Sequence, residues 1–105
     1  MQEITIENYR AREALGDGVI LIDVREDHEW VRGRIPGAMH LGRGILERDV
    51  EATFADKNAP LVLYCGGGYR SALACDNLQK MGYTNVLSLA GGIRGWTAAG
   101  LPVEE

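Results

Sequence analysis

One short stretch of the chain combines the residue types that a reactive sulfur and an anionic ligand require. It consists of Cys65, Gly66, Gly67, Gly68, Tyr69, Arg70 and Ser71. The apolar residues 61–63 before it have the character of a buried strand, and residues 72–81 after it have that of a helix. A loop of this kind surrounds one sulfur with backbone N–H groups, which suits a thiolate and an anionic ligand.

Cys65 is predicted to ionise more readily than an ordinary thiol. A position between a strand end and a helix exposes it to the positive helix terminus, to loop N–H groups and to Arg70, which all favour the thiolate. Glycine at positions 66 to 68 permits positive φ angles and removes side chains that would block the sulfur. We therefore interpret Cys65 as a nucleophile.

The other candidate nucleophile and metal ligands lack such a setting. Cys75 shares a predicted helix face with Ser71 and Leu78, a spacing typical of packing positions. His28 and His40 have no metal-ligand spacing and no evident cysteine partner, so we interpret both as structural or surface residues. No metal site is predicted.

The totals of the 105-residue chain indicate one ordinary globular domain over residues 1–105, with 46% hydrophobic residues and a formal net charge of −4. The acidic balance argues against nucleic-acid binding, and no apolar run is long enough to cross a membrane. Two cysteines without signal-peptide features at the start predict a cytoplasmic protein. Nine arginines could still form a local anion-attracting mouth: Arg10, Arg12, Arg25, Arg32, Arg34, Arg43, Arg48, Arg70 and Arg94.

The elements that must position the loop alternate between helices and strands. This alternation at short spacing predicts an α/β layer with a mostly parallel sheet. We expect helices over about residues 5–15, 26–31, 45–54 and 72–81 and from Gly91 onward, and strands over residues 19–24, 38–41, 61–63 and 86–89.

A series of short motifs runs through the chain in a fixed order. They are Asp23-Val24-Arg25-Glu26, Glu29-Trp30, Gly33, Ile35-Pro36-Gly37-Ala38, Cys65, Gly68, Arg70-Ser71 and Gly91-Gly92 with Trp96. In order and spacing they resemble the rhodanese-like sulfurtransferase domain over essentially the whole chain. The resemblance implies a three-layer α/β/α fold with a central, mostly parallel five-stranded sheet, and an active loop of six residues from Cys65 to Arg70.

The resemblance further implies covalent sulfur transfer through Cys65. Its thiolate would take the outer sulfur of thiosulfate or a persulfide donor, become a persulfide, and pass the sulfur to cyanide or a thiol. Residues 66–71 would bind the substrate, with loop amides stabilising the persulfide and Arg70 holding the sulfonate end of the donor. No metal and no organic cofactor is implied. A sulfur-relay protein is a candidate partner beside the small anionic donor and the acceptor.

Three residues outside the loop are candidates for supporting roles. Asp23 and Arg25 are interpreted first as an ion-pair and hydrogen-bond frame for the segment beside the loop. Arg43 could add positive charge at the mouth, although a solvated surface role fits it equally well. The chain departs from the family at Arg34, where histidine is common, and at Gly42, where proline is frequent, which leaves the shape of the mouth open.

Two other functions fit parts of this pattern. Cysteine phosphatases have a related loop with the arginine six positions after the cysteine, whereas Arg70 is five positions after Cys65. The shorter loop is better matched to a persulfide than to a tetrahedral phosphate. The second alternative is a sulfur relay or a regulatory binding module with little turnover. The intact cysteine and loop argue against a binding module that carries out no reaction. They do not distinguish a sulfur relay from an enzyme that acts on small molecules.

Overall fold

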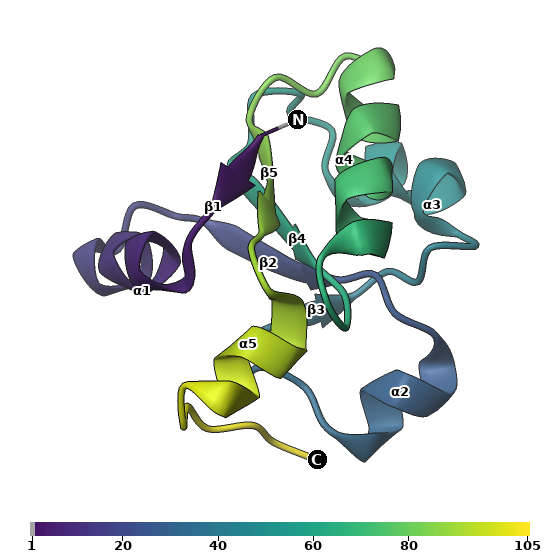
Figure 1. Ribbon diagram of the computed structural model, residues 1–105. Helices are drawn as coiled ribbons and strands as arrows, with labels where there is room; N and C mark the ends of the chain where they lie inside the picture. The colour runs from purple at the N-terminus through teal and green to yellow at the C-terminus, as the bar shows by residue number, and fades with distance from the viewer. Residues whose placement is uncertain (1) are drawn as a thin grey trace.

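The computed structural model describes residues 2–105, in which helices and strands alternate along the chain (Figure 1). The strands are β1 (Glu3–Ile4), β2 (Ile20–Asp23), β3 (Met39–His40), β4 (Leu61–Tyr64) and β5 (Val86–Leu89). The helices are α1 (Ile6–Leu15), α2 (Asp27–Arg32), α3 (Leu46–Thr53), α4 (Tyr69–Lys80) and α5 (Gly92–Ala98). None of the helices in this part of the chain is long and apolar enough to span a membrane.

The strands form one parallel, five-stranded sheet in the order β1-β5-β4-β2-β3, so β4 lies at its centre. A parallel sheet is normally covered on both faces, and its strands are therefore apolar on both sides. In β4, Leu61 and Leu63 pack into one core cluster, whereas Val62 and Tyr64 pack into the other. This alternation explains the uninterrupted apolar run before the cysteine.

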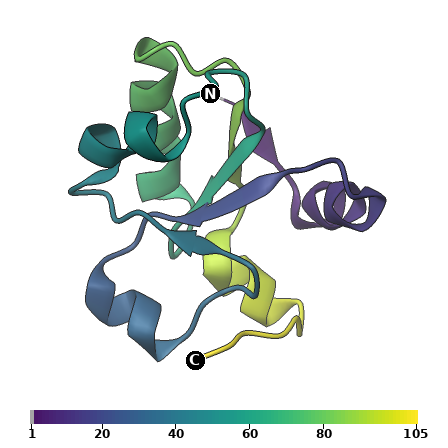
Figure 2. The same ribbon diagram turned by 180° about the vertical axis from the view of Figure 1, so that it is seen from behind.

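Helices cover both faces of the sheet, as the two opposite views show (Figures 1 and 2). On one face the buried core contains Leu46 and Val50 of α3 and Leu78 of α4. On the other face it contains Tyr9 of α1 and Trp96 of α5. Burying each such side chain stabilises the fold by about 1.5–3 kcal/mol. The predicted three-layer α/β/α architecture with a five-stranded parallel sheet is confirmed.

The predicted caps of α1 are confirmed. The Thr5 side chain accepts a hydrogen bond from the Asn8 N–H at 3.1 Å, and Gly16 ends the helix with a φ of 69°. Such a left-handed residue at a helix end favours glycine because it has no Cβ.

Two elements differ from the expectation. Strand β1 was not predicted, because two residues give no readable pattern, yet it pairs with β5 through Glu3 opposite Ser88. Helix α4 begins at Tyr69 rather than Ala72. Its N-cap is Gly68, with a φ of 106°, so the glycine run leads into the helix after a very short loop.

Candidate active site

Cys65 directly follows β4, at the carboxyl end of the central strand, and α4 begins at Tyr69. In open parallel α/β sheets, ligands bind outside the carboxyl ends of the strands. Cys65 is buried, whereas Tyr69 is 77% exposed at the rim of the loop. The fold thus brings the sulfur, the glycines and the first turn of α4 together at the end where a ligand is expected.

The sulfur of Cys65 accepts backbone hydrogen bonds from the start of α4. The N–H of Gly68 lies 3.1 Å from the sulfur, and the N–H of Ser71 lies 3.4 Å from it. In an ordinary helix, the side chain of the N-cap residue accepts the N–H of the second or third helical residue. The N-cap here is Gly68, which has no side chain, and the cysteine sulfur takes the Ser71 N–H instead.

These contacts favour the ionised form of Cys65. Burial raises the pKa of the thiol. Hydrogen bonds from the N–H and hydroxyl of Ser71 and from the N–H groups of Gly68 and Arg70 lower it by more, so the pKa lies below its ordinary value. Cys75 has the opposite balance, because burial, followed by the charge of Asp76, raises its pKa to about 12. Because the thiolate is the nucleophilic form of cysteine, these opposite pKa shifts favour Cys65 over Cys75 as the nucleophile.

A buried pair of serine hydroxyl groups lies next to the Cys65 sulfur. The Ser71 Oγ lies 3.6 Å from the Cys65 sulfur and 2.7 Å from the Oγ of Ser88 in β5. When Ser88 donates to Ser71, the Ser71 proton is free for the sulfur or for the Gly68 carbonyl at 3.2 Å. Sequence reasoning did not identify Ser88, because a lone serine in a strand carries no local signal.

Arg70 forms a two-point ion pair with Glu29 of α2. Its Nη1 lies 2.7 Å from Oε1, and its Nη2 lies 3.0 Å from Oε2. Glu29 is itself fixed by a capping box, since its Oε1 also accepts the N–H of Glu26, the N-cap of α2. The hydrogen bond to Glu29 raises the pKa of Arg70 above its ordinary value, which is already high. The arginine predicted to hold the donor is thus already bound to a carboxylate.

The Glu29–Arg70 pair makes stability depend on pH at the acid end. The hydrogen bond from Arg70 lowers the pKa of Glu29 from 4.5 to about 2. A lowered carboxylate pKa stabilises the fold fully above the unfolded-state value, and this contribution is lost as the pH falls through the folded-state value. Glu29→Gln should therefore lower the free energy of unfolding by about 0.5–1 kcal/mol at pH 7, typical of a partly exposed pair.

Urea denaturation from pH 7 to pH 2 measures this effect. The difference between the Glu29→Gln protein and the unsubstituted protein should shrink between about pH 4.5 and pH 2. Glu7→Gln on α1 is a suitable control, because Glu7 is exposed and has no ion-pair partner among residues 2–105. A difference that stays constant over the whole range would contradict the assignment.

The supporting candidates occupy different places. Asp23 and Arg25 form the predicted ion pair, and the structure shows that it is buried. The Arg25 Nη2 lies 2.8 Å from Asp23 Oδ2 and 2.6 Å from the Gly33 carbonyl oxygen. The Arg25 guanidinium also lies over the ring of Tyr64, the residue before the cysteine, at 5.7 Å from its centroid. Arg43 pairs instead with Glu47 at 2.8 Å, and no hydrogen bond or ion pair within residues 2–105 links it to the loop.

The three loop glycines have different roles. Only Gly68 uses a positive φ, so the conformational freedom expected of Gly66 and Gly67 is not used. Their missing side chains leave room for two guanidinium groups. A Cβ at Gly66 would lie 3.3 Å from Arg70 Nη2 and 3.5 Å from Arg94 Nη2, and one at Gly67 would lie 3.3 Å from Arg94 Nη1.

Helix α5 is joined to the loop through its first turn. The N–H of Ile93 donates to the Cys65 carbonyl at 2.9 Å, and the N–H of Arg94 donates to the Gly66 carbonyl at 3.0 Å. Gly92 permits this approach, because a Cβ there would lie 2.4 Å from the Cys65 carbonyl oxygen. The Gly91-Gly92 motif is therefore explained by contact between two backbones.

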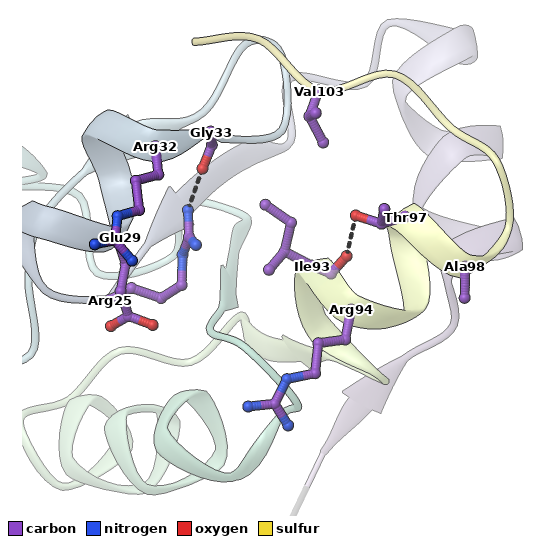
Figure 3. Close-up of a pocket in the computed structure, with 9 residues that line it drawn as sticks. All are labelled: Arg25, Glu29, Arg32, Gly33, Ile93, Arg94, Thr97, Ala98 and Val103. Carbon is purple, nitrogen blue, oxygen red and sulfur yellow. Dashed lines mark hydrogen bonds between the residues drawn. The ribbon is translucent and has the colours of Figure 1, made fainter.

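A pocket of about 610 Å³ lies beside the loop, between α2, α5 and the C-terminal segment (Figure 3). Its wall combines cationic and apolar side chains, including Arg32, Arg94, Ile93 and Val103. Glu29 and Arg94 belong both to this wall and to the surroundings of the loop.

The two histidines are not part of a metal-binding cluster among the described residues. Nowhere in residues 2–105 are three His, Cys, Asp or Glu side chains gathered as a metal ion would require. His40 stacks on Trp30 at 4.8 Å between ring centroids, and its Nε2 lies 2.9 Å from the Arg25 carbonyl oxygen. Arg34 covers the Trp30 ring at 4.7 Å. His40 and Arg34 thus pack against α2.

The fold and the site define a parallel α/β domain with a thiol of lowered pKa at the end of its central strand. The chain matches the rhodanese-like domain over residues 7–99, and it belongs to that family. A sulfurtransferase from Allochromatium vinosum is 36% identical over 103 residues, which cover 98% of this chain and 94% of that protein. The thiosulfate sulfurtransferase GlpE of Haemophilus influenzae is 33% identical over 98% of this chain and 94% of its own length.

A similar solved structure carries a different description. A Rhodopseudomonas palustris protein of unknown function, described as a possible tyrosine phosphatase, is 34% identical with a TM-score of 0.89, covering 99% of this chain and 85% of that one. The family and the two sulfurtransferase relatives support sulfur transfer as the general reaction class.

Proposed function

We propose that this protein is a sulfurtransferase that carries a sulfane sulfur on Cys65, with thiosulfate or a persulfide as donor and cyanide or a thiol as acceptor. The proposal rests on the surroundings of the Cys65 sulfur. It is a buried thiol with a lowered pKa that accepts N–H groups from the first turn of α4. A thiolate, rather than a thiol, is the form that attacks sulfur.

The reaction proceeds in two displacement steps. The Cys65 thiolate attacks the outer sulfur of thiosulfate, a new S–S bond forms, and the S–S bond of the donor breaks with its electron pair leaving on sulfite. Cyanide or a thiolate then attacks the outer sulfur of the persulfide and restores the Cys65 thiolate. Both steps conserve charge without a proton donor, a metal or an organic cofactor, and they give ping-pong kinetics.

The loop backbone supplies a place for the charge of the persulfide. The N–H groups of Gly66, Gly67 and Tyr69 have no hydrogen-bond acceptor among residues 2–105. Because they belong to the loop that follows the cysteine, they are available to an outer, anionic sulfur atom, and preorganised donors of this kind stabilise developing charge. The exposed side chain of Tyr69 is consistent with a role at the rim.

Phosphate ester cleavage and sulfur relay, the two alternative activities, would require different properties of the loop. Phosphate ester cleavage needs a ring of N–H donors around a tetrahedral group, and the five-position spacing from Cys65 to Arg70 makes a smaller ring. A sulfur relay uses the same persulfide but a protein acceptor, so it is a variant of the proposal. Because the chain has two free cysteines and one of them is reactive, we place the reaction in a reducing cytoplasm.

Intact-mass measurement tests the proposal directly. After incubation with thiosulfate and removal of excess donor, the protein should gain the mass of one sulfur atom, and peptide mapping should locate that atom on Cys65. Cyanide should then restore the original mass and yield thiocyanate. Failure to gain sulfur from thiosulfate, from an organic thiosulfonate and from a persulfide donor would refute it. Cys65-dependent hydrolysis of an aryl phosphate would favour the phosphatase.

A further inference from the structure

We propose that Arg94, rather than Arg70, is the residue that binds the anionic end of the sulfur donor. This inference rests on the proposed function and names the group that selects an anionic donor at the same site. The sequence offers Arg94 only as one of nine arginines that could attract anions. The structure sets it apart through its position against the loop, and unlike Arg70 it has no carboxylate partner among residues 2–105.

Helix α5 places Arg94 beside the loop. Arg94 lies in the first turn of α5, whose N–H groups are fixed on the carbonyls of Cys65 and Gly66. Its guanidinium lies against the loop itself, with Nη1 and Nη2 at 3.3 Å and 3.5 Å from the points where Cβ atoms of Gly67 and Gly66 would stand. The charged group is therefore held beside the entrance to the sulfur.

Arg70 and Arg94 differ in whether their guanidinium groups already have a partner. Arg70 uses both terminal nitrogens in its ion pair with Glu29. Arg94 is exposed, and its side chain makes no hydrogen bond or ion pair with any residue from 2 to 105. An anion can bind Arg94 with no carboxylate beside it, whereas the Nη1 and Nη2 N–H groups of Arg70 that face Glu29 are already occupied.

The charges around Gly66 are only partly balanced. The guanidinium groups of Arg70 and Arg94 both lie within contact distance of the same point beside Gly66. Glu29 neutralises the first of them, and the second leaves a local positive charge on a chain whose overall charge is −4. A donor with an anionic sulfonate group compensates this charge when its outer sulfur reaches Cys65. Planar guanidinium groups bind such oxyanions through paired N–H groups.

The neighbouring pocket extends the assignment to the shape of the donor. From Arg94 the pocket continues past Ile93 towards Val103, with Arg32 on the α2 side (Figure 3). An apolar substituent on the sulfonyl group of an organic thiosulfonate anion (RSO2S−), with the sulfonyl oxygens bound at Arg94, would lie along Ile93 and Val103. The chemical class selected is thus thiosulfate, which releases sulfite when Cys65 takes its outer sulfur, or an organic thiosulfonate anion, which releases a sulfinate.

Single-turnover kinetics test the role of Arg94. Arg94→Gln should lower the second-order rate constant for persulfide formation from thiosulfate about 10–100-fold, the loss expected for one charged hydrogen-bond partner. Arg94→Lys should retain an intermediate rate, because the charge is kept without the paired donors. Sulfur removal from the preformed persulfide by an uncharged thiol reagent should change less than about twofold. Lys80→Gln, which removes one positive charge at the far end of α4, should match the unsubstituted protein.

A binding measurement separates this inference from the proposed function. In a Cys65→Ala background no persulfide can form, and calorimetry with thiosulfate reports on the anion site alone. Cys65→Ala protein should bind thiosulfate, and adding Arg94→Gln should weaken that binding at least about tenfold. Equal binding by both proteins, or binding by neither, would overturn the inference. An Arg94→Gln protein that slows both half-reactions equally and melts at a lower temperature would also overturn it, since that pattern indicates a structural role.

Discussion

The Cys65→Ser protein should lose sulfur transfer from thiosulfate to cyanide by more than about 10³-fold, the effect of removing a covalent nucleophile. A serine hydroxyl is not ionised near neutral pH and cannot form a persulfide. It can still accept the N–H of Ser71 that the sulfur accepts at 3.4 Å, so the fold should persist. Thiocyanate formation measures activity, and circular dichroism with thermal melting measures folding.

Cys75→Ala is the matched control. Cys75 is equally buried, but it lies in α4 with its pKa raised to about 12, and no step of the proposed chemistry uses it. This protein should keep most of the activity and should still gain one sulfur from the donor. A Cys65→Ser protein that remains folded and active, or a Cys75→Ala protein that is folded but cannot be persulfidated, would contradict the assignment of the nucleophile.

Gly92→Ala should disable the site from a position outside the loop. The added Cβ would lie 2.4 Å from the Cys65 carbonyl oxygen and 2.7 Å from that of Gly66, and the backbone has a φ of 56°. Backbone strain and overpacking together should cost about 3–5 kcal/mol of unfolding free energy. Relief of the contact requires α5 to move away from the loop, which breaks the hydrogen bonds from Ile93 and Arg94. Urea denaturation and persulfide formation measure the two consequences.

Gly16→Ala separates backbone strain from steric contact. Gly16 has a comparable φ of 69°, but a Cβ there would meet nothing within 4 Å. Its substitution should therefore cost only about 1–2 kcal/mol of unfolding free energy and leave activity unchanged. If Gly92→Ala were no more disruptive than Gly16→Ala, the close docking of α5 on the loop would not be required for the site.

Much of the fold was predictable because its signals are local. The apolar run that becomes β4, the cap at Thr5 and the glycine at position 16 each specify a structure within a few residues. Strand β1 was not predictable, because its two residues become a strand only by pairing with β5, more than eighty residues later. The early start of α4 depends on the conformation of Gly68, which a run of three glycines does not reveal.

The same difference between local and long-range signals decides which residues of the candidate site could be predicted. Cys65 and the lowering of its pKa could be inferred from a strand, a loop and a helix that are contiguous in the chain. The partner of Arg70 could not, because Glu29 lies 41 residues earlier and approaches only when α2 packs beside the loop. Arg94 and Ser88 also reach the site through the docking of α5 and β5. The glycines at 66 and 67 were expected to supply both backbone freedom and open space, and only the space is used.

The place of the Cys65 sulfur at the start of α4 links catalysis to stability. Because the sulfur accepts the N–H of Ser71 in place of a capping side chain, the contacts that lower the thiol pKa also hold the first turn of the helix. Ionisation of Cys65 therefore stabilises the folded chain. This contribution is complete above the pKa of the unfolded thiol and is lost as the pH falls through the lower pKa of the folded protein. As far as Cys65 is concerned, the fold is thus stabilised by the same protonation state in which the thiol reacts.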